Sequence, residues 1–378
     1  MSERTCRDDQ SVEVVQVFRI ALTGDFLNER GEIAYGDIGI GLLDAVPHVR
    51  HHFIRDLAPQ PGDALYWSRL YSLEVTPEHI QAVDGLVVLR PWVRRETLAR
   101  RAGELVVIGR SGAGYDKIDV EACTEHDVAV FNAPDALNHS TASSVLMFML
   151  ALAKRLSAQD RITRAGRWDL QASVMGHELT GRTLGIVGLG RSGRELVRLV
   201  APFKLQIIAF SPHADAGEAA GMGVKLVSLD DVFRQSDFVS LHARLDAETR
   251  GMIGEGQFRL MKPTAYFINV ARGELVDQSA LVAALRERRI AGASLDVYEH
   301  EPLPANDPLT KLDNVILAPH FSCSTADIWR ATGEAMARGM LRAARGQVPE
   351  NIVNPDVLAR TGFQTKLARF REKRVAAS

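Results

Sequence analysis

Short apolar runs alternate along most of this chain with longer segments of helical spacing. The first runs predict the strands of one sheet, at 17–22, 85–89, 105–108 and 128–131. A second series predicts six more strands, at 183–187, 206–210, 237–241, 265–270, 292–296 and 314–317. Strands that alternate with helices are typical of parallel sheets covered on both faces. We therefore expect an α/β protein with two doubly wound parallel-sheet domains.

Several segments between and after these runs carry helix signals. Thr76, with Pro77 at the first helical position, predicts a helix start. A long helix is expected at about 140–155, and others at 278–288 and 324–345. The apolar run 145–153 is too short to cross a bilayer, so it predicts a buried helix instead.

The strand at 183–187 runs directly into a glycine-rich turn and then a helical pattern. Glycines stand at 188, 190 and 193, in the spacing Gly-x-Gly-x-x-Gly. Gly188 allows the tight turn, Gly190 lets a pyrophosphate approach the backbone, and Gly193 lets helix and strand pack closely. Arg191 and Ser192 belong to the same loop, whose helix N-terminus attracts phosphate. The loop therefore predicts a dinucleotide site.

The position of this loop suggests how the chain is divided. The strand series that begins at 183 is complete at 317, so the helix after it is expected to return to the first sheet. The prediction is a Rossmann dinucleotide-binding domain at 140–321. It is inserted in a flavodoxin-like substrate domain made of 1–139 and 322–378.

Composition narrows the class of partner. The chain has 378 residues, with 45 basic and 47 acidic side chains and a net charge of -2, which argues against nucleic acid as a partner. Cys6, Cys123 and Cys323 have neither metal-site nor disulfide spacing, so no metal is expected. The N-terminus lacks the apolar core of a signal peptide, so we expect a cytoplasmic protein without a membrane segment.

Three later segments place reactive side chains at strand ends. Arg272, Asp296 and His320 each follow a predicted strand, and Glu301 lies on the loop after one of them. Strand ends of a doubly wound sheet face the ligand crevice. Histidine suits proton transfer near neutral pH, a carboxylate orients it, and arginine grips a planar carboxylate with two hydrogen bonds.

These motifs, in this order, resemble the D-isomer-specific 2-hydroxyacid dehydrogenases. The resemblance covers about 85–355 and rests on the glycine loop, Asn-x-x-Arg-Gly, Asp-Val-Tyr-Glu-x-Glu-Pro and Pro-His. It implies that Arg272 binds the substrate carboxylate and keto oxygen. It implies that His320 is the acid/base and that Glu301, by its spacing in the motif, is its partner. Glu299 is then interpreted as a solvated loop charge, and His300 is expected to be exposed rather than catalytic.

The resemblance also implies further binding residues, some with an open alternative. Ala271 and Asp296 would contact the cofactor, although Asp296 could instead cap a loop. The loop Gly112, Ala113, Gly114 would bind substrate through backbone N–H groups, with a plain turn as the alternative. Arg90 would bind the distal end of the substrate or be merely solvated.

Three positions depart from the family pattern. Ser211 follows the second strand of the glycine-loop series, where an acidic residue normally accepts from the adenosine ribose. Ser211 can bond a ribose hydroxyl but does not repel a 2′-phosphate. No arginine stands beside it to attract one, and Asp215 and Glu218 follow, so NAD is expected and NADP is the alternative cofactor. Segments 141–144 and 321–323 also differ from relatives, so which 2-hydroxy acid is used, and in which direction, stays open.

The predicted function is an NAD(P)-dependent oxidoreductase that interconverts a 2-oxo acid and a D-2-hydroxy acid. The alternative is a dinucleotide-sensing binding protein of the corepressor type. Apolar residues within 140–175 lead us to expect a homodimer. The basic tail has Phe363, Leu367 and Phe370 at helical spacing. It is interpreted as a helix packed on its own protein or on a partner subunit, with an anionic-surface contact as the alternative.

Overall fold

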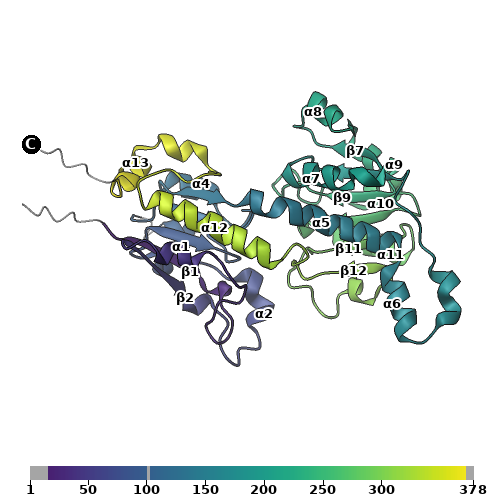
Figure 1. The fold of residues 1–378 in the computed structure, drawn as a ribbon, viewed down its shortest axis with the longest axis horizontal. Coiled ribbons are helices and arrows are strands. Elements are labelled where there is room, and N and C mark those ends of the chain that lie inside the picture. The colour runs from purple at the N-terminus through teal and green to yellow at the C-terminus, as the bar shows by residue number, and fades with distance from the viewer. Residues whose placement is uncertain (1–15, 100–102, 372–378) are drawn as a thin grey trace, which may run out of the picture.

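The computed structural model describes residues 16–99 and 103–371, which form two adjacent α/β domains (Figure 1). The first sheet is wholly parallel, with the order β2-β1-β3-β4-β5. This is the flavodoxin-like strand order. Its strands are β1 (Phe18–Thr23), β2 (Val49–Ile54), β3 (Gly85–Val88), β4 (Val107–Arg110) and β5 (Ala129–Asn132). Cys6 and the last basic residues of the tail lie outside the described residues.

The second sheet is also parallel, with the order β12-β11-β10-β9-β6-β7-β8. The order reverses between β6 and β9, as in a Rossmann domain, with one strand added at the β12 edge. The predicted fold class is therefore confirmed. The strands are β6 (Thr183–Val187), β7 (Gln206–Phe210), β8 (Val224–Leu226), β9 (Phe238–Leu241), β10 (Tyr266–Asn269), β11 (Gly292–Leu295) and β12 (Val315–Leu317).

Helices cover both sheets, and α5 connects the two domains (Figure 1). The helices of the first domain and its return segment are α1 (Ile40–Asp44), α2 (Tyr66–Arg69), α3 (Arg95–Leu98), α4 (Val120–Glu125), α12 (Ala326–Ala343) and α13 (Thr361–Ala368). The others are α5 (Pro134–Ala153), α6 (Leu156–Arg164), α7 (Arg191–Val200), α8 (Ala216–Gly221), α9 (Leu229–Gln235), α10 (Glu255–Leu260) and α11 (Gln278–Arg286).

Two strands were missing from the sequence prediction, and each is an edge strand. In β2 the end residues are buried while the residues between them, two of them histidines, are exposed or half-buried. In β8 only Val224 is buried. An edge strand has one paired neighbour and an accessible side, so it needs no continuous apolar run. The glycine-loop sheet therefore has seven strands rather than the six expected.

Two helix predictions also need correction. Helix α5 begins at Pro134, earlier than the expected 140, because proline is well placed at the first helical position. The start at Thr76 leads only to the 3₁₀ turn Pro77–Ile80, in which Thr76 N donates to His79 Nδ1 at 3.0 Å. The chain enters β3 five residues after this turn, which leaves no room for a full helix.

Helix α5 is the one described helix that is long and apolar enough to cross a membrane, judged by length and composition alone. Its residues Val145, Phe148, Met149 and Leu152 are buried in the core beneath β6 and α7. The helix is thus a core element of the second domain, as the apolar run 145–153 predicted.

The C-terminal segment packs on the first domain. Phe363, Leu367 and Phe370 are buried in the same core as Met336 and Met340 of α12. The interpretation of the tail as a helix packed on its own protein is therefore confirmed for the described residues. The chain does return to the first sheet after β12, while the limits 1–139, 140–321 and 322–378 stay predictions.

Candidate active site

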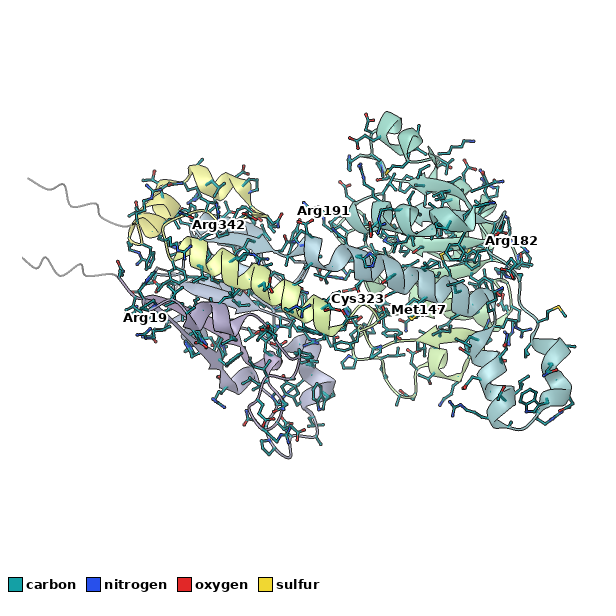
Figure 2. The ribbon with its side chains drawn as sticks, viewed as in Figure 1. Arg19, Met147, Arg182, Arg191, Cys323 and Arg342 are labelled. Atoms are coloured by element: carbon teal, nitrogen blue, oxygen red, sulfur yellow. The ribbon has the colours of Figure 1, made fainter. Side chains whose placement is uncertain are left out.

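A cleft of about 600 Å³ lies between the two domains. Its lining comes mainly from the loops that follow β3, β4, β9, β10, β11 and β12, with Ser192 at the start of α7, so the carboxyl ends of strands from both sheets meet there. Arg191 of α7 and Cys323, after β12, both lie where the domains meet (Figure 2). The expectation that strand ends form a crevice is met in this arrangement.

The glycine loop has the geometry that each glycine was expected to provide. Gly188 has φ +98, and a Cβ there would come within 2.6 Å of Ala243 N. A Cβ on Gly193 would stand 2.5 Å from Gly188 O, so the helix packs closely on the turn. Above Gly190 a Cβ would meet nothing within 4 Å, which leaves open space in front of the α7 N-terminus. The loop therefore fits a dinucleotide pyrophosphate.

The polar residues of the loop already have partners. Arg191 pairs with Asp135 of α5 at 2.6 Å. Ser192 Oγ lies 3.0 Å from His242 Nδ1. Burial lowers the pKa of His242 to about 4, so its ring is neutral at pH 7. Ser211 directly follows Phe210, whose carbonyl accepts from Gly188 N at 2.8 Å, so Ser211 lies beside the glycine loop.

His320 and Glu301 come together as the resemblance implied. His320 Nδ1 lies 2.7 Å from Glu301 Oε2, and Glu301 Oε1 accepts from Tyr298 N at 3.1 Å. The second ring nitrogen, Nε2, remains for a reacting group. His320 has φ 55, a left-handed conformation that costs a non-glycine residue about 1–3 kcal/mol. The ring of Tyr71, from the first domain, is stacked on it at 5.8 Å.

Arg272 follows β10 and reaches across the cleft to the first domain. Its Nε and Nη2 lie 3.0 and 2.8 Å from Asp116 Oδ1, and its Nη1 donates to Ala271 O at 2.7 Å. Burial opposes ionisation of Asp116, but the charge and hydrogen bonds of Arg272 hold the pKa of that carboxyl below its usual value. A Cβ on Gly114 would overlap the guanidinium, so this approach requires glycine.

The predicted substrate loop, Gly112 to Gly114, lies directly opposite Arg272. Gly112 has φ +141, which favours glycine. Arg110, the last residue of β4, folds over the loop and donates to Ser111 O. Burial, followed by repulsion from Arg272, lowers the pKa of Arg110 to about 10. No carboxylate of the described residues lies within 4.0 Å of Arg110, so the guanidinium lines the cleft without an acidic partner in contact.

Arg90 is not the solvated arginine of the alternative interpretation. Its side chain is 13% exposed, it pairs with buried Asp25 at 3.5 Å, and its Nη1 donates to the Tyr35 hydroxyl at 3.2 Å. It lines the same cleft as His320.

Asp296 is buried at the end of β11 and accepts hydrogen bonds from Phe321 and Ser322. These are the contacts expected of a loop-capping aspartate, while a role toward the cofactor stays a prediction. Glu299 and His300 are exposed, as expected.

Several cleft residues were not predicted. Lys117 donates to Tyr71 O at 2.8 Å, and its Nζ lies 4.8 Å from the centre of the Tyr71 ring. Burial lowers the pKa of Lys117 to about 8, against the attraction of Glu301 and Asp116. Arg110, Asp116 and Lys117 flank the predicted substrate loop, Gly112 to Gly114, so their charges in the sequence could have indicated that they belong to the site. Tyr71 lies in a segment without any periodic pattern and gave none.

The comparisons with known proteins agree with this geometry. Residues 146–322 match the family model described as D-isomer specific 2-hydroxyacid dehydrogenase, NAD binding domain. A glyoxylate reductase from Korarchaeum cryptofilum is 38% identical over 290 residues, which are 76% of this chain and 87% of that one. A D-3-phosphoglycerate dehydrogenase from Methanocaldococcus jannaschii is 41% identical over 278 residues, 73% of this chain but 53% of that longer chain.

Among solved structures, a glyoxylate reductase from Paecilomyes thermophila aligns with a TM-score of 0.73 and 28% identity. The alignment covers 89% of this chain and 98% of that one. The parallel sheets, the glycine loop and the similarity to these reductases and dehydrogenases support one conclusion: the chain belongs to the D-isomer-specific 2-hydroxyacid dehydrogenase family and is an NAD(P)-dependent oxidoreductase.

Proposed function

We propose that this protein reduces a small 2-oxo acid to the D-2-hydroxy acid, with His320 as the proton donor. The observation that carries the proposal is the meeting of the His320–Glu301 pair, Arg272 and the glycine loop around one interdomain cleft. The named relatives are reductases and dehydrogenases, so the corepressor-type alternative is not favoured.

Each residue has a distinct part in the proposed reaction. Arg272 holds the substrate carboxylate with parallel hydrogen bonds, helped by backbone N–H groups of the loop Gly112 to Gly114. When bound, the reduced nicotinamide supplies the hydride. His320 donates a proton from Nε2 to the developing alkoxide, while Glu301 on Nδ1 orients the ring.

The cations in the cleft support a substrate with a polar or anionic group beyond the 2-oxo acid. Arg90, Arg110 and Lys117 all line the cleft, and only Arg90 has an acidic partner among the described residues. The test is a turnover assay with a panel of 2-oxo acids that includes glyoxylate and with 3-phospho-D-glycerate in the oxidative direction. If the protein turns over none of these compounds, the proposed function is contradicted.

The residues expected around the adenosine ribose of the cofactor support a modest preference for NADH over NADPH. Ser211 carries no charge, and Arg194 on α7 already pairs with Glu218 at 2.8 Å. Arg194 Nε also donates to Leu189 O of the glycine loop at 3.2 Å. The ratio of kcat/KM with the two cofactors decides this, and a higher value with NADPH would contradict the preference.

A cytoplasmic homodimer that binds neither nucleic acid nor membrane completes the proposal. Helix α6 projects from the body of the protein and has no buried residue (Figure 1). Leu156, Trp168 and Met175, in and after this helix, are 58%, 64% and 75% exposed. Apolar side chains concentrated on a projecting segment favour burial against a second copy. Light scattering at micromolar concentration tests this, and a monomeric mass would contradict it.

A further inference from the structure

The connection from β2 to β3 brings an aromatic side chain to the cleft. Neighbouring parallel strands are usually joined through a full α-helix. In this connection α2 has only four residues, Tyr66–Arg69, and the 3₁₀ turn Leu70–Ser72 follows it directly. Tyr66 and Leu70 are buried and attach the segment to the first domain. Tyr71, between Leu70 and the end of this turn, lines the cleft.

The backbone of Tyr71 is held by two other parts of the first domain. Its carbonyl oxygen accepts from Trp92 Nε1 at 3.1 Å and from Lys117 Nζ at 2.8 Å. Just after it, Trp92 N donates to Leu73 O and Val75 N donates to Trp92 O, both at 2.8 Å. Tyr71 is thus fixed by the segment after β3 and by the loop after β4.

The ring of Tyr71 has three neighbours in the cleft. The imidazole of His320 lies 5.8 Å from it, centre to centre, with 15° between the two planes. Lys117 Nζ and the guanidinium carbon of Arg90 lie 4.8 and 6.0 Å from the ring centre, within the range of a cation–π interaction. The ring therefore forms a fixed part of the cleft wall beside the acid/base.

The proposed reaction leaves one direction for the third group on C2 of the substrate. This carbon is planar and carries a carboxylate, the keto oxygen and one further group. Arg272 takes the carboxylate, His320 takes the oxygen, and the hydride arrives on one face of the plane from a cofactor held by the second domain. The third group is left to face the first-domain wall, which Tyr71 and Arg90 form. The cleft of about 600 Å³ must also admit the nicotinamide, so little space remains in front of this wall.

We propose that Tyr71 is a specificity-determining residue, whose ring limits the third group on C2 to a small one. The favoured substrates are then short 2-oxo acids, in which this group is hydrogen, methyl or hydroxymethyl, and branched or aromatic groups are excluded. The inference rests on the proposed function, because it takes His320 and Arg272 as the groups that orient the substrate. Arg90, which is paired with Asp25, supports the ring from the far side.

The experiment measures kcat/KM with NADH for glyoxylate, hydroxypyruvate, 4-methyl-2-oxopentanoate and phenylpyruvate. Tyr71→Ala removes the ring, and Tyr71→Phe keeps the ring without its hydroxyl. Tyr71→Leu is the milder variant if Tyr71→Ala does not fold, which the melting temperature shows. Trp67→Ala is the matched control, because Trp67 is an aromatic residue of the same segment that is 52% exposed and does not line the cleft.

The wild type should favour glyoxylate over phenylpyruvate by at least about tenfold in kcat/KM, as expected for a pocket that limits size. In Tyr71→Ala this ratio should fall by about tenfold or more, and in Tyr71→Leu by about threefold, because space opens beside His320. Tyr71→Phe should keep the wild-type ratio within about twofold, since the ring remains. Trp67→Ala should match the wild type within about twofold for every acid, as expected of an exposed site.

Two results would overturn the inference. One is an equal loss of kcat/KM for all four acids in Tyr71→Ala, which would mean that the ring only supports His320. The other is a wild-type protein that reduces phenylpyruvate as well as glyoxylate. A wild type that reduces none of the acids would instead contradict the proposed function. Binding of the same acids to the protein–NADH complex, followed by NADH fluorescence, would then still show whether Tyr71→Ala admits the larger ones.

Discussion

The glycine loop is one contiguous hexapeptide, whereas the groups around His320 come from separate segments of both domains. Gly188, Gly190 and Gly193 obtain their geometry from β6, α7 and the neighbouring β9 loop. The second site needs the loop after β4, the loop after β10, the segment before β3 and the turn after β12. The first site is complete within one domain, and the second exists only where two domains meet.

Because one site lies within a single domain and the other is built by two, cofactor binding and the catalytic step depend on different contacts. Contacts across the cleft, such as Arg272–Asp116 and the hydrogen bond from Arg244 to the Tyr115 hydroxyl at 2.6 Å, depend on how the domains close. Those within the glycine loop do not. Substitutions in the second site should therefore change turnover while leaving cofactor affinity intact, and those in the first should do the reverse.

Replacement of His320 by alanine should have the largest effect. We expect kcat for 2-oxo acid reduction to fall about 10²- to 10⁴-fold, because general acid catalysis is lost. NADH Kd should be unchanged, since the glycine loop is untouched. His52→Ala is the control, because His52 is exposed on the edge strand β2 and does not line the cleft. Near wild-type reduction by His320→Ala would mean that another group donates the proton.

Arg272→Ala should follow, with losses in both substrate affinity and rate. The carboxylate loses its bidentate partner and the alkoxide loses a nearby charge, so kcat/KM should drop about 10²- to 10³-fold. Arg259→Ala removes an exposed arginine of α10 and serves as the control. A change confined to NADH Kd would contradict the assignment of Arg272 to the substrate.

Gly190→Ala should weaken NADH binding by about tenfold, or about 1.4 kcal/mol, with little change in melting temperature. The added methyl group points into open space, so it obstructs the cofactor and not the fold. Gly193→Ala is the contrasting variant, since its Cβ would stand 2.5 Å from Gly188 O and should lower the melting temperature. If both variants lost the same stability, Gly190 could not be assigned to cofactor binding and Gly193 to packing.

The smallest predicted effect concerns the pH dependence of substrate binding. Lys117 has a pKa of about 8, so it is charged below pH 8 and loses its charge above it. KM for an anionic 2-oxo acid should therefore rise about two- to fivefold between pH 7 and 9, as one attractive charge is lost. In Lys117→Gln the KM should be higher at pH 7 and flat over this range. An unchanged pH dependence in the variant would exclude Lys117.

The central strands and the glycine loop could be predicted from sequence because each is a local pattern. Buried parallel strands such as β6 and β10 are continuous apolar runs. The edge strands β2 and β8 lack such runs and were missed.

The His320–Glu301 pair followed from strand ends and family spacing, since parallel strands bring their carboxyl ends to one edge. Tyr71 and the pairing of Asp116 with Arg272 did not, because these contacts depend on the relative placement of two domains. No short segment of sequence encodes that placement.

The transfer of hydride itself tests the central claim most directly. The protein is supplied with NADH deuterated at C4 of the nicotinamide and with an accepted 2-oxo acid of three or more carbons, and the product is analysed by chiral chromatography and mass spectrometry. The account predicts a D-2-hydroxy acid that carries one deuterium at C2. An L product would contradict it. So would a D product that carries no deuterium whichever face of C4 is labelled.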